Sequence, residues 1–104
     1  MTTITVKKKS AIESIVISGH SGYKSEGSDI VCASISSMVI TTVNACLKVD
    51  ETSIDYEKKN GFVKIDIQKQ DSMVILLIEN MISLLEELAS QYPKYVKVTE
   101  EVYL

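Results

Sequence analysis

The stretch DIVCASISSMVITTVNACL, residues 29–47, decides the fold because it predicts one long, largely apolar helix. Its apolar residues recur at intervals of three and four, which is the spacing of a helical face. Few charges interrupt the stretch, so we expect this helix to be well buried. Ser28 or Asp29 is the natural N-cap, because a short side chain with an oxygen accepts hydrogen bonds from the first turn. The apolar positions are Ile30, Val31, Ile35, Met38, Val39, Val43, Cys46 and Leu47.

Alternating, β-branched segments lie on both sides of this helix. Residues 2–7 (TTITVK) and 12–18 (IESIVIS) predict two strands before it. Residues 53–58 and 62–68 predict a hairpin after it. The hairpin turn is Lys59-Asn60-Gly61, whose Asn-Gly pair supplies the positive φ angles of a tight turn.

A second helix and a last strand complete the chain. Asp71 or Ser72 caps this helix, which runs to about Gln91 and is ended by Pro93, and residues 95–103 predict the strand. The order β-β-α-β-β-α-β predicts an α+β fold, a two-layer sandwich with two helices on a mostly antiparallel sheet. With 104 residues, the chain is expected to form a single domain, residues 1–104.

Composition excludes several classes of function. The net charge is −3 and all eleven cationic residues are lysines, so we expect no nucleic-acid binding by bulk charge. The N-terminus has no apolar run that would serve as a signal peptide, and no run of about 18 apolar residues predicts a membrane span. Two cysteines without an export signal indicate reduced thiols, and we expect a cytoplasmic protein.

The two cysteines are too far apart to act together. On one helix, Cys32 and Cys46 lie about 21 Å apart at ~1.5 Å per residue, which excludes a disulfide or a shared zinc site. His20, Cys32 and one carboxylate would make an incomplete metal shell, so we expect no metal and no cofactor. Cys46 lies among apolar residues and is expected to be a small buried hydrophobe.

Cys32 differs because it falls in the first turn of the predicted helix. Free N–H groups and the positive end of the helix dipole favour a thiolate there, and a thiolate attacks carbonyl carbons. His20, the only histidine, ends a strand and enters a glycine-bearing segment that leads to this helix. Its imidazole is a candidate general base for the thiol. A buried cysteine and a surface histidine are also commonplace, so the pair alone leaves an inert role open.

Asp29 has two possible roles in this pattern. Its carboxylate would either orient the imidazole of His20 or simply cap the helix. The residues themselves leave both roles open.

The segment from Gly19 to Cys32 resembles a known family signature. Gly19-His20, a loop of similar length, Gly27 and then Asp29-Ile30-Val31-Cys32-Ala33 are similar to the Prp family of ribosomal-processing cysteine proteases. The length and element order also resemble that family. Ser34 departs from the pattern, because an alanine or glycine commonly follows Ala33, and a small serine should fit there.

The resemblance implies a cysteine endopeptidase that removes an N-terminal extension from a large-subunit ribosomal protein. Cys32 would be the nucleophile and His20 its general base, with the oxyanion held by backbone N–H groups at the helix start. The loop of residues 19–28 would be mobile and ordered by an apolar, aromatic peptide. The resemblance also implies a homodimer. The residues expected to bind substrate or orient the dyad are Gly19, Gly22, Tyr23, Gly27 and Asp29.

Two rival hypotheses remain beside proteolysis. Gly19-His20-Ser21-Gly22 matches the four-residue G-x-x-G loop of RNA-binding KH domains, although that loop joins two helices. Alternatively, the chain is a non-catalytic dimeric module in which Cys32 only packs the first helix. Tyr23 also has a purely structural alternative, as a partly exposed tyrosine that packs on the sheet.

Overall fold

The computed structural model describes residues 1–25 and 29–103, and across these ranges the chain has the predicted element order. Most element boundaries lie within two residues of those that the sequence predicts. The elements are β1 (Thr2–Lys8), β2 (Ile12–Ser18), α1 (Ile30–Val49), β3 (Ile54–Lys59), β4 (Phe62–Ile67), α2 (Ser72–Gln91) and β5 (Val96–Val102). Gly27, which the resemblance singled out, lies outside the described residues.

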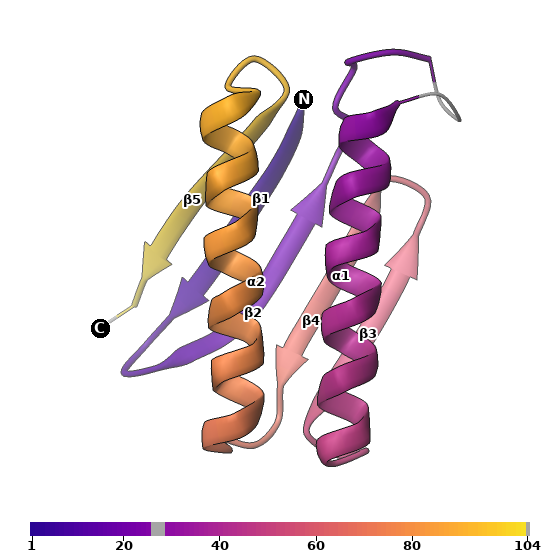
Figure 1. Ribbon diagram of the computed structural model, residues 1–104. Coiled ribbons are helices and arrows are strands. Elements are labelled where there is room, and N and C mark those ends of the chain that lie inside the picture. Colours follow the sequence, from indigo (N-terminus) through magenta and orange to yellow (C-terminus); the bar gives the residue numbers. More distant parts are fainter. Residues whose placement is uncertain (26–28, 104) are drawn as a thin grey trace.

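The strands form one sheet in the order β3-β4-β2-β1-β5. Three of the strand pairs are antiparallel, and β5 pairs with β1 in parallel after the crossover through α2. Both helices lie on the same face of this sheet (Figure 1). The prediction of a two-layer α+β sandwich with a mostly antiparallel sheet is therefore confirmed.

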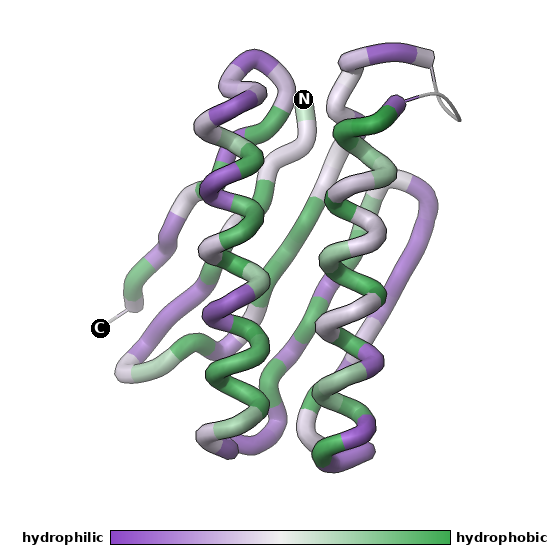
Figure 2. Tube along the Cα trace, in the orientation of Figure 1, coloured by the Kyte–Doolittle hydropathy of each residue, from purple (hydrophilic) through white to green (hydrophobic). Residues whose placement is uncertain are grey.

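The core lies between the helices and the three inner strands. Strand alternation turns Ile4 and Val6 of β1 toward the helices, and their register partners on β2 are Ile17 and Ile15. Ile65 of β4 continues the same row opposite Ile15. In Figure 2, apolar residues (green) recur along both helices and along the strands that the helices cover. The fully buried residues of α2 are Val74, Ile78, Met81 and Leu85.

Helix α1 packs as predicted along most of its apolar face. Val31, Ile35, Val39, Val43 and Cys46 are buried, each at 6% exposure or less. Ile30 and Leu47, at the two ends of the predicted face, are instead exposed. By length and composition alone α1 is long and apolar enough to cross a membrane, which the apolar-run criterion did not predict. Core helices pass the same test, and its buried face is part of the core.

Leu85 and Leu84 offer a matched test of this core. Leu85 is fully buried in α2, whereas Leu84 is 40% exposed. Leu85→Ala should lower the free energy of unfolding by about 2–5 kcal/mol, because it leaves a cavity. Leu84→Ala should change it by about 0.5 kcal/mol or less. Urea unfolding followed by circular dichroism measures both, and equal effects would contradict the helix orientation.

Candidate active site

Asp29 fixes the start of α1 and with it the position of Cys32. Its backbone is extended, as at an N-cap, and its Oδ1 accepts hydrogen bonds from the backbone N–H groups of Val31 (2.9 Å) and Cys32 (3.0 Å). The Asp29 carbonyl accepts from Ala33 N–H (3.0 Å). Cys32 thus lies in the first helical turn, half-buried, where its thiol faces the preceding loop.

Ser21 is the residue that contacts the sulfur of Cys32. Its backbone N–H donates to Cys32 Sγ at 3.4 Å, and the thiol donates to Ser21 Oγ at 3.5 Å. The Ser21 hydroxyl in turn donates a short hydrogen bond to Asp29 Oδ2. Ser21 is only 2% exposed and Asp29 7%, so the hydroxyl and the carboxylate are screened from solvent, whereas Cys32 is half-buried.

The Asp29 carboxylate stays ionised in this setting. Burial alone would raise the pKa of Asp29, but hydrogen bonds from the Ser21 hydroxyl and from the backbone N–H groups of Cys32, Lys24 and Val31 outweigh it. Together they lower the pKa to about 2. Of the two roles that the sequence leaves open for Asp29, the structure shows capping: no hydrogen bond among the described residues joins it to His20.

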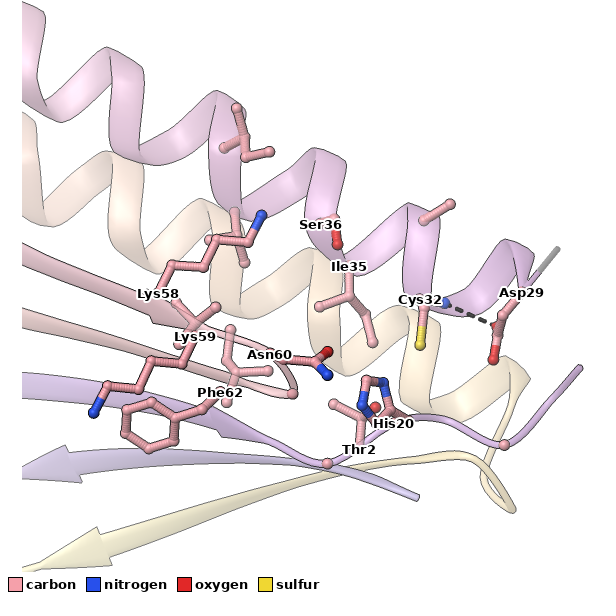
Figure 3. A pocket seen from close by; sticks show the side chains of 18 of the residues that line it. Thr2, His20, Asp29, Cys32, Ile35, Ser36, Lys58, Lys59, Asn60 and Phe62 are labelled. Carbon is pink, nitrogen blue, oxygen red and sulfur yellow. Dashed lines mark hydrogen bonds between the residues drawn. The ribbon is translucent and has the colours of Figure 1, made fainter. Parts of the chain in front are cut away.

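His20 lies on the other side of the same pocket, at the end of β2. Its side chain is exposed, and its ring lies against the β3–β4 turn: an ideal Cβ on Gly61 would be 3.0 Å from His20 Nε2. Among the described residues, the hydrogen bonds of Cys32 Sγ are with Ser21, and none is with His20. The structure therefore brings His20 and Cys32 to one pocket without joining them (Figure 3).

The pocket is a cavity of about 400 Å³ between α1 and the β3–β4 hairpin, a size that ligand sites commonly have. Apolar side chains from α1 form one wall, and the hairpin turn forms the other. Thr2 also lines it, and its buried Oγ1 has no hydrogen-bond partner among the described residues. The wall residues include Ile35, Val39, Ile40, Tyr56, Asn60 and Phe62.

Tyr23 and two glycines shape the segment that follows His20. The Tyr23 ring packs edge-on against Tyr92 (centroids 5.6 Å apart) and Tyr95 (5.3 Å), at the end of α2. It is partly buried and is not among the residues that line the pocket, and a substrate contact stays a prediction. Gly19 (φ +90°) and Gly22 (φ +74°) both line the pocket in the left-handed conformation.

Two further expectations differ in outcome. Cys46 is fully buried, as predicted, and burial raises the pKa of its thiol. The expectation that backbone N–H groups at the helix start hold an oxyanion stays a prediction, and in this structure those of Val31, Cys32 and Ala33 bond Asp29. The described backbone donor that points at the sulfur is Ser21 N–H.

Sequence reasoning missed Ser21 and the contribution of the hairpin to the pocket. A serine after a histidine in a glycine-bearing loop has no distinguishing signal. The Asn60-Gly61 turn was predicted, but nothing local connects it to His20, 41 positions earlier in the chain. The geometry of the turn differs in part from the prediction, in which both Asn60 and Gly61 have positive φ. Among the described residues only glycines have positive φ, so Gly61 has it and Asn60 does not.

The charge of Asp29 gives a pH-dependent test. Its pKa is about 2 in the folded protein and about 3.9 when unfolded, so ionisation stabilises the fold above about pH 4. That contribution should be lost as the pH falls from about 4 to 2. Asp29→Asn keeps an oxygen for the helix start but has no charge, so the stability difference between the two proteins should shrink over this range. Urea unfolding between pH 2 and 6 measures it, and a constant difference would contradict the assignment.

Comparison with known proteins identifies a family for this chain. The model of the family described as cysteine protease Prp matches residues 1–97. The chain is 24% identical to the ribosomal processing cysteine protease Prp of Staphylococcus aureus over 98 residues, covering 91% of this chain and 92% of that protein. It is 27% identical to the protein of the same name from Bacillus subtilis over 107 residues, covering 96% of each.

Solved structures agree on the fold. The S. aureus protease Prp, crystallised with a covalently linked product peptide, superposes with a TM-score of 0.90 at 20% identity, over 97% of this chain and 100% of that one. SMU.848 from Streptococcus mutans superposes with a TM-score of 0.82 at 28% identity, over 99% and 96%. With a family match over nearly its whole length, this chain belongs to the Prp family of cysteine proteases.

Proposed function

We propose that this protein removes the N-terminal extension of a large-subunit ribosomal protein, with Cys32 as nucleophile and His20 as general base. The observation that carries the proposal is the half-buried Cys32 thiol in the first turn of α1, lining one pocket with the only histidine in the chain. Two relatives named as ribosomal processing proteases support the substrate class, as do structures of the S. aureus protein with substrate and product peptides.

The proposed reaction needs one proton carrier and one nucleophile. His20 takes the proton of the Cys32 thiol, and the thiolate attacks the carbonyl carbon of the scissile bond. His20 then gives the proton to the leaving amine, which leaves an acyl group on Cys32. Water, deprotonated by His20, hydrolyses that thioester and restores the free thiol.

The surroundings of the sulfur act in two directions. The helix start and the Ser21 N–H group favour negative charge on Sγ. The ionised Asp29 carboxylate opposes it, although its charge is spread over hydrogen bonds to Ser21 and to the helix. A nearby imidazolium would offset this opposition. We therefore expect the thiolate to form together with the approach of His20.

Substrate binding supplies that approach in our proposal. In the described geometry, the Cys32 sulfur is hydrogen-bonded to Ser21, and the His20 ring lies on the hairpin turn. A peptide in the pocket would displace the Ser21 hydroxyl and draw the imidazole toward Sγ. The glycines on either side, Gly19 and Gly22, allow such a change at low cost in backbone strain. The apolar wall of α1 suits an apolar, aromatic peptide.

Cytoplasmic location and a homodimeric assembly are part of the same proposal. A protease that trims a ribosomal protein has its substrate where ribosomes are made. The most exposed apolar side chains of α2, Met73 (57%) and Leu76 (64%), are available to a second copy of the chain.

The RNA-binding alternative loses its structural basis. Gly19-His20-Ser21-Gly22 follows the strand β2 rather than joining two helices, so it lacks the setting of a KH loop. The non-catalytic alternative is likewise opposed by membership of a protease family.

Mass spectrometry of a mixture with the extended ribosomal protein of the same host tests the proposed function. The unchanged protein should release the N-terminal peptide, and Cys32→Ala should release none. Cys32→Ser should be nearly inactive, because an alkoxide forms far less readily than a thiolate. His20→Ala should lower turnover by about 10²–10⁴-fold.

Ser34→Ala is the matched control, because Ser34 is close to Cys32 on α1, does not line the pocket, and donates its hydroxyl to the Ile30 carbonyl. It should cleave normally. Unimpaired cleavage by a folded Cys32→Ala protein would dismiss the mechanism.

Thiol alkylation tests the nucleophile without a substrate. Cys32 is half-buried at a helix start, whereas Cys46 is fully buried. Iodoacetamide near neutral pH should therefore label Cys32 well before Cys46. Peptide mapping by mass spectrometry locates the label, and slow, equal labelling of both would favour an inert thiol.

A further inference from the structure

The turn between β3 and β4 is in direct contact with His20, although it is distant in sequence. An ideal Cβ built on Gly61 would lie 3.0 Å from His20 Nε2, 3.5 Å from Cδ2 and 3.6 Å from Cε1. The imidazole thus rests on the one side of Gly61 where any other L-residue carries its side chain. Ordinary contact between such atoms begins at about 3.4 Å, so a Cβ would move the ring by a few tenths of an ångström.

The same turn also holds the backbone next to His20. The Gly19 N–H group donates to the Gly61 carbonyl at 2.8 Å, and the adjacent register pair is Ser18 with Phe62. The hairpin therefore fixes the chain just before His20 and supports its ring at the same time.

The positive φ of Gly61 (+69°) does not by itself require glycine. Asparagine enters the left-handed region readily, and tight turns accept it there. What a side chain would meet here is the imidazole, whose Nε2 lies 3.0 Å from the Cβ position. Experiment can therefore separate the need for a positive φ at Gly61 from the need to leave space for the imidazole.

We propose that Gly61 is a positioning residue for His20: its missing side chain lets the imidazole rest on the β3–β4 turn, the position from which it moves to Cys32 when a peptide binds. The proposal rests on the proposed role of His20 as general base. A 1 Å displacement of a catalytic group is able to cost about 10²-fold in rate, so a side chain that shifts this starting position should slow turnover. Gly61 also lines the pocket, so the effect that runs through His20 is identified by comparing backgrounds with and without the imidazole.

Gly61→Asn isolates the contact with the ring, and Gly61→Ala adds backbone strain to it. We expect Gly61→Asn to fold with a thermal midpoint near that of the unchanged protein but to lose roughly 10- to 100-fold in kcat. Gly61→Ala should lose similar activity and also melt at a lower temperature. Cleavage of the extended ribosomal protein measures the rates, and thermal melting measures the fold.

The His20→Ala background is the control that separates positioning from general damage. If Gly61 acts through His20, adding Gly61→Asn to His20→Ala should change the residual rate by no more than about twofold. An equal proportional loss in both backgrounds would overturn the proposal, as would full turnover by Gly61→Asn alone.

A substrate-free measurement keeps this test distinct from that of the proposed function. His20 is the only histidine, so its imidazole protons give unambiguous NMR signals. In the unchanged protein they should show nuclear Overhauser contacts to the Gly61 α-protons, and in Gly61→Asn the ring signals should shift. An absence of cleavage by the unchanged protein would count against the proposed function alone. Unshifted ring signals in Gly61→Asn would overturn the positioning role alone.

Discussion

The carboxylate of Asp29 is the constraint on which the geometry around the sulfur depends. One of its oxygens binds the N–H groups that open α1, and the other binds the hydroxyl of Ser21, eight residues earlier. A buried carboxylate is costly unless its oxygens are bonded, and here the bonds more than offset the burial. This one carboxylate therefore joins the helix start to the Ser21 hydroxyl that contacts the Cys32 sulfur.

The two members of the proposed dyad differ in burial and in the elements that hold them. Cys32 is half-buried in a helix whose next turn is anchored by Ile35, a core residue. His20 follows β2, is exposed, and rests on a hairpin at the edge of the sheet. In the proposed mechanism, an exposed base beside a nucleophile on the core helix fits a site that the bound peptide completes. In the described geometry the sulfur is hydrogen-bonded to Ser21, and among the described residues no hydrogen bond joins it to the imidazole that we propose as its base.

The features that the sequence predicted depend on residues close together in the chain. Those that it missed depend on contacts between residues far apart in the chain. Helix α1, its cap and the buried Cys46 follow from a local period of three to four residues, and the hairpin follows from an Asn-Gly pair. The choice between two roles for Asp29 required the position of Ser21, which only the folded loop supplies. The contact of Gly61 with His20 crosses from one strand end to another, and no local pattern encodes such a pairing. Tyr23 shows the same limit, since its partners Tyr92 and Tyr95 lie at the far end of the chain.

Sheet register is the step that brings these distant parts together. β2 and β4 pair with Ile15 opposite Ile65 and Ile17 opposite Val63, so the apolar row toward the helices is continuous. A slip by one residue would turn that row to the open face, so the hydrophobic pattern fixes the pairing. The same register sets Ser18 opposite Phe62, and therefore Gly19 and His20 beside Gly61. Burial of the isoleucines in the middle of the sheet thus determines, at its end, where the imidazole rests relative to the thiol.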